Sequence, residues 1–118
     1  MTEKQRSNGV VLALNGEFNE SQRDRLKAAF DGVLDEPLVV LDVTKTANID
    51  SSVLGSLLRL RGELLQRGGA LIVAGPTVMI QRLLEITCLT ELFDVRPALA
   101  ETDTAAGLRR VELVSDET

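Results

Sequence analysis

The chain alternates short apolar runs with longer amphipathic stretches, a pattern that predicts strands separated by helices. Three apolar runs, residues 10–14, 38–43 and 70–74, are bounded by polar or glycine-containing turns, as buried strands usually are. Residues 38–43 are rich in β-branched side chains, and we expect them to form the central strand, parallel to its neighbours. A short last strand is expected over residues 92–95.

The stretches between these strands carry apolar residues at helical spacing. We expect a first helix over residues 20–34, with Asn19 and Gln22 forming a capping box at its start and a proline ending it. A second helix is expected to open at residues 50–52, to bury a stripe of leucines and to end at the glycine pair 68–69.

Two further helices and one loop complete the predicted elements. The third helix is expected over residues 77–87, and a fourth over residues 105–113 with Thr102 or Asp103 as its cap. Residues 44–48 are polar and are expected to form a loop after the central strand. Strands and helices are therefore expected to alternate along the chain.

This order of elements predicts a single α/β domain over residues 1–118, with a mostly parallel central sheet and helices packed around it. The polar ends, residues 1–8 and 114–118, are expected to be flexible tails. Open α/β sheets place functional sites at the carboxyl ends of their strands. Residues 16–19 and 50–55 both follow strands, so we treat them as one candidate surface.

The charge and the residue inventory exclude several classes of function. The 18 acidic and 13 basic residues give a net charge of -5, and no basic cluster is interleaved with aromatic residues, so a nucleic-acid partner is not expected. The chain has no histidine and a single cysteine, Cys88, which excludes a zinc cluster, a Ser-His-Asp triad and a Cys-His pair. Its carboxylates are dispersed rather than paired, so we expect no enzyme activity, no metal and no cofactor.

No apolar run approaches the ~20 residues of a membrane-spanning helix, and the N-terminal residues lack the apolar region of a signal peptide. We therefore expect a cytoplasmic protein that does not insert into a membrane. Cys88 is expected to be a small buried hydrophobe, and Leu54, Leu57 and Leu58 are expected to belong to the core.

Residues 50–52, Asp-Ser-Ser, stand at the start of the second predicted helix. Such side chains cap the free backbone N–H groups of a first helical turn, and the positive end of the helix can also accommodate a phosphate. For Asp50 and Ser52 we favour the capping role, while Glu17 and Asn19 fit a first helical turn as well as a partner contact. Taken without context, such a tripeptide more often serves as a cap alone than as a site of modification.

Five short motifs follow one another along nearly the whole chain: Gly16-Glu17-Phe18-Asn19, Leu41-Asp42-Val43, Ile49-Asp50-Ser51-Ser52, Gly68-Gly69, and Arg82-Leu83-Leu84 through Leu89 to Leu92-Phe93. In the order and spacing of these motifs the chain resembles the STAS domain, the fold shared by bacterial anti-sigma-factor antagonists and by regulatory domains of anion transporters. Each motif is short, and it is their order that identifies the family.

The resemblance implies that Ser51 is phosphorylated, because it stands at the position that is modified in antagonists of this family. It implies that the unphosphorylated protein binds an anti-sigma factor that is also a kinase, and thereby regulates transcription indirectly. Phosphorylation by that partner ends the association, and a phosphatase restores the binding form. The partner surface is expected to comprise Glu17, Asn19, Asn48, Asp50, Ser51, Ser52, Val53, Leu54 and Gly55.

The resemblance also allows a second function, that of a non-catalytic subunit of a larger assembly such as a transporter accessory protein or a stressosome-like scaffold. Three positions differ from the family pattern: Val53 and Cys88 replace glycines, and Asn19 replaces an aspartate. Val53 puts a β-branched side chain where a kinase loop would approach the backbone.

Overall fold

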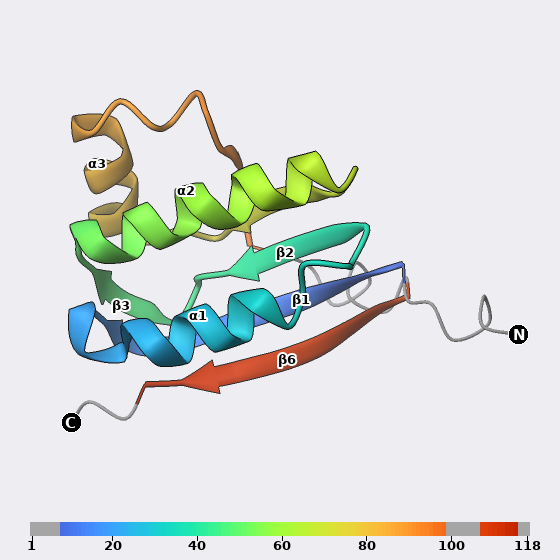
Figure 1. Cartoon of the computed structure of the whole chain (residues 1–118). Coiled ribbons are helices and arrows are strands. Elements are labelled where there is room, and N and C mark those ends of the chain that lie inside the picture. The colour runs from blue at the N-terminus through green and yellow to red at the C-terminus, as the bar shows by residue number, and fades with distance from the viewer. Residues whose placement is uncertain (1–7, 99–106, 116–118) are drawn as a thin grey trace, which may run out of the picture.

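The computed structural model describes residues 8–98 and 107–115, which form one sheet with helices packed against it (Figure 1). The strands are β1 (Gly9–Phe18), β2 (Leu38–Asp42), β3 (Thr46–Ile49), β4 (Ala70–Ala74), β5 (Asp94–Arg96) and β6 (Leu108–Val114). The helices are the 3₁₀ turn η2 (Glu20–Gln22), α1 (Arg23–Asp31), α2 (Ser51–Gln66) and α3 (Val78–Ile86).

The six strands of this part of the chain follow the order β3-β1-β2-β4-β5, with β6 paired to β1. Each of these strand pairs is parallel. The first half of β1 pairs with β2 and with β6 at once, so these two strands lie on opposite edges of β1. The last residues of β1 pair with β3 instead. β1 is therefore the strand on which the sheet is assembled.

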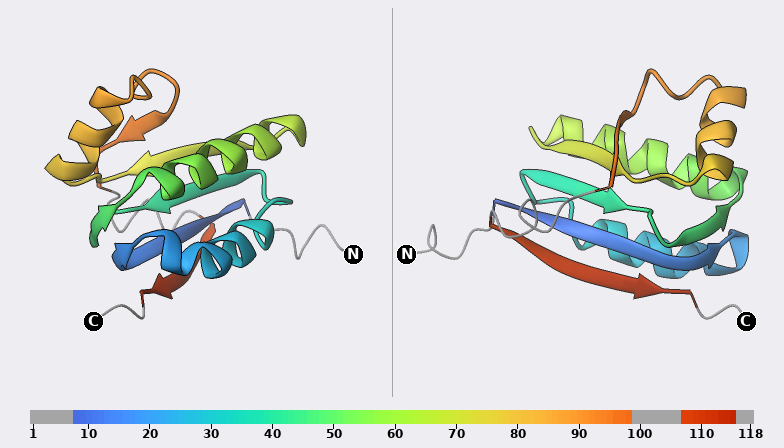
Figure 2. Two further views of the ribbon diagram at one scale, coloured as in Figure 1. Left: turned by 60° about the vertical axis from the view of Figure 1, so that its left-hand side comes forward. Right: turned by 180° about the vertical axis from the view of Figure 1, so that it is seen from behind.

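α1 and α2 lie side by side on one face of the sheet, and α3 stands at the end of the sheet beyond β4 (Figures 1 and 2). The main core fills the space between these helices and the sheet, and its largest fully buried side chains are Phe18, Leu12, Leu14, Leu26, Leu41, Leu60 and Leu64. A smaller cluster, Val11, Val40 and Ala74, lies on the opposite face of the sheet. β1 and β2 are thus buried on both faces, which explains their uninterrupted apolar sequences.

Several predicted elements are confirmed. β2 is the middle strand of the sheet, β4 has the predicted bounds, and α3 begins at a Thr77 cap whose hydroxyl accepts from the Ile80 N–H at 3.3 Å. α2 ends at the glycine pair as predicted, because Gly68 has a φ of +83° and the Gly69 N–H donates to the Leu64 carbonyl at 2.8 Å.

Two predictions about the segment between β1 and α2 are wrong. The turn expected at residues 15–16 does not form, because β1 continues to Phe18 through a bulge between Gly16 and Glu17. The loop expected over residues 44–48 contains most of β3. The Thr46 hydroxyl donates to the Leu14 carbonyl at 2.7 Å, which anchors β3 to β1. Pairing with β1 rather than hydrophobicity makes this polar segment a strand.

The helix predicted over residues 105–113 is also wrong, because β6 occupies this part of the chain. β6 pairs residue for residue with β1, and its β-branched Val111 and Val114 favour a strand. Gly107 has a φ of +101°, which a helix cannot accommodate. Thr102 and Asp103, the predicted caps, lie outside the described residues.

The C-terminal tail does not begin at residue 114 as expected. Val114 is the last residue of β6, and the Ser115 hydroxyl donates to the Glu17 carbonyl at 2.6 Å. The same hydroxyl accepts from the Gln22 side chain at 2.8 Å. Ser115 therefore connects the end of β6 to the turn between β1 and α1.

The first predicted helix is divided into the 3₁₀ turn η2 and the helix α1. α1 ends at Asp31, before the predicted boundary at residue 34. Asn19 caps this start as predicted, with its side-chain oxygen accepting from the Ser21 N–H at 2.9 Å. Gln22 does not complete a capping box, since its side chain is buried and donates to Ser115.

Cys88 was expected to be buried, and this is wrong: its side chain is exposed. Leu58, expected in the core, is also exposed at 36%. Cys88 follows α3 with a φ of +61°, its N–H donates to the Glu85 carbonyl at 3.1 Å, and the Leu89 N–H donates to the Leu84 carbonyl at 2.8 Å. This is the Schellman ending that Gly68 provides for α2, and it favours glycine at position 88.

Cys88→Gly is expected to stabilise the domain by about 1 kcal/mol, because glycine adopts the left-handed conformation without a steric cost. Cys88→Ala removes the thiol but keeps the steric cost, and it is the matched control. Urea denaturation of both variants measures the difference. Equal stability of the glycine and alanine variants would contradict this account of the turn.

Candidate functional site

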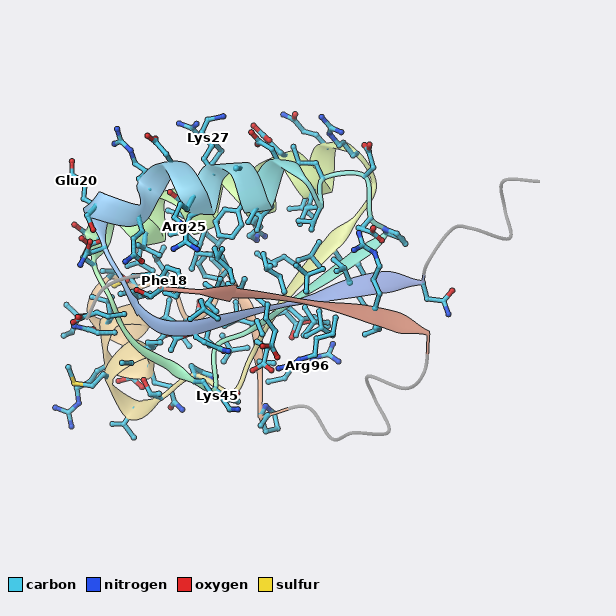
Figure 3. The ribbon with its side chains drawn as sticks, turned by 90° about the horizontal axis from the view of Figure 1, so that it is seen from below. Phe18, Glu20, Arg25, Lys27, Lys45 and Arg96 are labelled. Carbon is cyan, nitrogen blue, oxygen red and sulfur yellow. The ribbon has the colours of Figure 1, made fainter. Side chains whose placement is uncertain are left out.

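The pairing of β3 with β1 brings together the two loops that the sequence assigned to one surface. Glu17 lies opposite Asn48, and Phe18 lies opposite Ile49. Both strands end here, so the segments that follow them start η2 and α2 at neighbouring points. Together with the hydrogen bond from the Glu20 N–H to the Asp50 carboxylate at 3.1 Å, these contacts confirm that residues 16–19 lie beside the start of residues 50–55. Phe18 and Glu20 mark this end of the molecule in Figure 3.

Asp50 joins the two helical starts through its carboxylate. One oxygen, Oδ1, accepts from the Val53 N–H at 3.1 Å and from the Ser52 hydroxyl at 2.7 Å, which caps α2. The other oxygen, Oδ2, accepts from the Glu20 N–H at 3.1 Å, at the first residue of η2. The capping role predicted for Asp50 is confirmed, and the contact to Glu20 extends it to a second helical element.

The hydrogen bonds also set the charge of Asp50. Partial burial alone would raise the pKa of this carboxyl, but the donors from Ser52, Val53 and Glu20 outweigh burial and hold the pKa below its ordinary value. Asp50 is therefore ionised at neutral pH. Its negative charge lies at the N-terminus of α2, where the helix dipole stabilises it.

Ser51 and Ser52 differ in their surroundings although they are adjacent. The hydroxyl of Ser52 is half-buried and engaged by Asp50. The side chain of Ser51 is exposed at the first residue of α2, and its hydroxyl has no hydrogen-bond partner among residues 8–98 and 107–115. Of the two serines, Ser51 is the one whose hydroxyl is presented to solvent.

Two residues that were predicted to belong to the partner surface are buried in the core instead. Val53 and Leu54 are 1% and 4% exposed and belong to the main core, so their side chains are not available to a partner. The exposed members of the predicted set are Glu17, Asn48, Ser51 and Gly55, and the half-buried members are Asn19, Asp50 and Ser52. We call these seven residues the Ser51 surface.

A groove of about 590 Å³ between α1 and α2 begins beside this surface at Ser52. Its polar rim carries charges of both signs, and its floor includes Phe30 and Leu60. It is lined by Arg23, Asp24, Lys27, Phe30, Asp31, Leu34, Ser52, Gly55, Ser56, Arg59, Leu60 and Glu63. Sequence reasoning missed the α1 side of this groove, because spacing along one helix does not reveal which face of another it opposes.

In the part of the chain that the structure describes, no group of three or more acidic or cysteine side chains is placed to hold a metal ion. No helix among residues 8–98 and 107–115 combines the length and apolar character needed to cross a membrane.

The profile of the STAS domain matches residues 1–102. The chain belongs to the STAS domain family. The matched range contains β1 to β5 and the helices α1 to α3, whereas β6 lies beyond its last residue. No curated protein sequence gives a significant match.

Solved structures with the same fold include two described as anti-sigma factor antagonists and one described as a sulfate transporter family protein. The anti-sigma factor antagonist SpoIIAA in its unphosphorylated form is 17% identical with a TM-score of 0.66, over 84% of this chain and 87% of that one. A candidate anti-sigma factor antagonist from Thermotoga maritima is 21% identical with a TM-score of 0.65, over 77% and 79%. A sulfate transporter family protein from Wolinella succinogenes is 20% identical with a TM-score of 0.68, over 78% and 79%.

Asp50→Ala is expected to destabilise this STAS domain by about 1–2 kcal/mol, because two helical starts lose their acceptor. Asp50→Asn is the matched control: its single amide oxygen can retain the α2 cap but cannot also accept from Glu20, so a smaller loss is expected. Chemical denaturation of the two variants at neutral pH measures both effects. Equal losses would show that the charge, and not the geometry of the cap, is what matters.

The stability of the wild type is expected to fall in acid, and Asp50→Asn is expected to reduce that fall. Because the pKa of Asp50 is lower in the folded chain than in the unfolded one, its contribution is complete above about pH 4 and is lost as the pH drops through the folded-state pKa. The pKa of Asp42 is also lowered, since hydrogen bonds from Thr44 and Arg110 outweigh its burial, so some acid dependence remains. Denaturation between pH 2 and pH 6 tests this; parallel curves for the two proteins would refute it.

Proposed function

We propose that this STAS domain is an anti-sigma-factor antagonist of a bacterial cytoplasm, which binds an anti-sigma factor kinase and is switched off when that kinase phosphorylates Ser51. A phosphatase would return it to the binding form. The observation that carries the proposal is the exposed Ser51 hydroxyl at the start of α2, beside an Asp50 that is already committed to capping. The structural likeness to SpoIIAA supports the fold on which it depends.

The position of Ser51 is compatible with reversible modification. A phosphoserine carries about -1.5 to -2 charges at neutral pH, and at a helix N-terminus the free backbone N–H groups and the dipole stabilise that charge. The Ser51 side chain is not part of the core, so the added group requires no repacking. The domain should therefore keep its fold in both states.

A bound partner would respond differently to the phosphate. The Ser51 surface already contains the carboxylates of Glu17 and Asp50, and a further negative charge between them and a partner adds repulsion and a desolvation cost. Each 1.4 kcal/mol lost in the complex weakens binding about tenfold. A small electrostatic change at this position is enough to end the association.

The replacement of glycine by Val53 does not obstruct this surface. The Val53 side chain is 1% exposed and points into the main core, and its N–H donates to Asp50. A partner that approaches α2 from outside meets the backbone and the exposed Gly55, where no other side chain lies within 4 Å of the space a Cβ would take. The family difference at position 53 is therefore absorbed by the core.

A second candidate function is that of a non-catalytic subunit in a larger assembly, such as a transporter accessory protein or a scaffold. The likeness to the Wolinella succinogenes protein of the sulfate transporter family favours it as much as the antagonists favour the first, since the TM-scores are similar. The partner recovered from the native cell separates the two. A membrane transporter complex would support the second function, and a soluble kinase would support the first.

The wild type is expected to gain one phosphate on incubation with the cognate anti-sigma factor kinase and ATP, because its Ser51 hydroxyl is exposed. Ser51→Ala should gain none. Ser52→Ala is the matched control and should still be modified, because the Ser52 hydroxyl serves Asp50. Intact-mass spectrometry measures each outcome, and equal labelling of Ser51→Ala and the wild type would refute the assignment.

Ser51→Glu is expected to weaken binding to the anti-sigma factor at least tenfold, because it puts a negative charge on the Ser51 surface. Gln66→Glu adds the same charge at the opposite end of α2 and should leave the affinity within about twofold. Calorimetric titration with the purified partner compares them. Similar losses in both variants would mean that net charge, and not its position, governs binding.

A further inference from the structure

Among the described residues β6 pairs with β1 alone, and its other edge is left without a strand. It forms the margin of the sheet in Figure 1 and in the right-hand view of Figure 2. Most of its residues are exposed, including Val111 at 36% and Val114 at 56%. An exposed strand edge is a template for pairing with another strand.

The hydrogen bonds of β6 show which of its backbone groups face outward. The Ser115 N–H donates to the Asn15 carbonyl of β1 at 2.8 Å, and β6 pairs with β1 without a register shift. Successive residues of a strand direct their N–H and C=O groups to opposite edges. Arg109, Val111 and Leu113 therefore bond to β1, while Arg110 and Glu112 direct their backbone groups away from the sheet.

We propose that β6 pairs antiparallel with β6 of a second copy of this chain, about a two-fold axis at Val111. In this register Arg110 lies opposite Glu112 of the second copy, and each such pair exchanges both backbone hydrogen bonds. Val111 lies opposite Val111 of the second copy, with no hydrogen bonds between the two. Two sheets would thus join into one, an isologous contact of the kind that C2 dimers use.

The charges of β6 favour this register over its neighbours. Moving the axis to Arg110 puts two arginines opposite each other, and moving it to Glu112 does the same with two glutamates. With the axis at Val111, each guanidinium meets a carboxylate and Leu108 lies opposite Val114, so opposite charges and apolar side chains pair on the same face. Of these three registers, only the one with the axis at Val111 places opposite charges together.

The side chains that would meet are already held in place. The Arg110 guanidinium donates to Asp42 at 3.2 Å and to Glu112 of its own strand at 3.1 Å, which keeps both charged groups on one face of β6. At the end of the strand Arg25 reaches down from α1 and donates to the outward Val114 carbonyl at 2.9 Å (Figure 3). Arg25 therefore limits pairing to the part of the edge centred on Val111.

A cysteine cross-link tests the register directly. Val111→Cys in a Cys88→Ser background is expected to form a disulfide-linked dimer under mild oxidation, because opposed residues without hydrogen bonds have Cα atoms about 4.5 Å apart, within disulfide range. Val114→Cys in the same background is the control, since its two thiols would be about 20 Å apart along the strands. No covalent dimer from the Val111 variant, or equal cross-linking of both, would overturn the proposal.

Sedimentation velocity of the full chain over a concentration series tests the charge pairing. The wild type is expected to self-associate as concentration rises, and Glu112→Arg to weaken this at least tenfold by putting arginines opposite each other. Glu85→Arg makes the same charge change on the exposed face of α3 and should associate as the wild type does. Circular dichroism establishes that each variant is folded. A wild type that stays monomeric, or a Glu112→Arg variant that associates as tightly, would refute the pairing.

Discussion

The short pairing between β3 and the end of β1 determines where the candidate site lies. Without it, the turn after β1 and the turn before α2 would be separate surface loops. With it, the Glu20 N–H and the Val53 N–H come within hydrogen-bond distance of a single carboxylate. Asp50 can then satisfy donors at two helical starts, and the orientations of η2 and α2 depend on the same side chain. The Ser51 surface is a product of this arrangement.

β1 has a comparable role for the sheet. It pairs with β2, β3 and β6, and its side chains contribute to the clusters on both faces. A strand in this position has little freedom in its sequence, because both faces and both edges are occupied. The bulge at Gly16 is where β1 changes partners from β2 to β3, and Gly16 has a φ of +111° there. The glycine permits a backbone conformation that other residues rarely adopt.

The elements that could be predicted from the sequence are those whose residues carry their own signal. The apolar runs of β2 and β4 indicate burial on both faces, and the Asp50 cap and the Gly68-Gly69 ending delimit α2 through local hydrogen bonds. β3 and β6 could not be predicted in this way, because their polar residues become strands through pairing with β1, which is remote in sequence.

The geometry around the candidate site could be predicted to a similar extent. The start of α2 at Asp50 and Ser51 was predicted because a helix start has a recognisable composition, and the neighbouring loops were predicted because parallel strands end at one edge. Val53 and Leu54 were wrongly included in the partner surface, because the resemblance selects consecutive residues whereas their helical spacing directs both side chains into the core. The α1 side of the groove was missed because it depends on how two helices pack against each other.

The hydrogen bonds of Asp50 have a consequence for the chemistry at Ser51. A general base has to accept a proton from the hydroxyl that it activates, which requires an available lone pair and a pKa near the working pH. The carboxylate of Asp50 accepts from Ser52, Val53 and Glu20, and its pKa is lowered rather than raised. Asp50 therefore caps the helix that Ser51 begins but is a poor proton acceptor for the Ser51 hydroxyl. The phosphorylation proposed for Ser51 therefore cannot depend on Asp50 as its base.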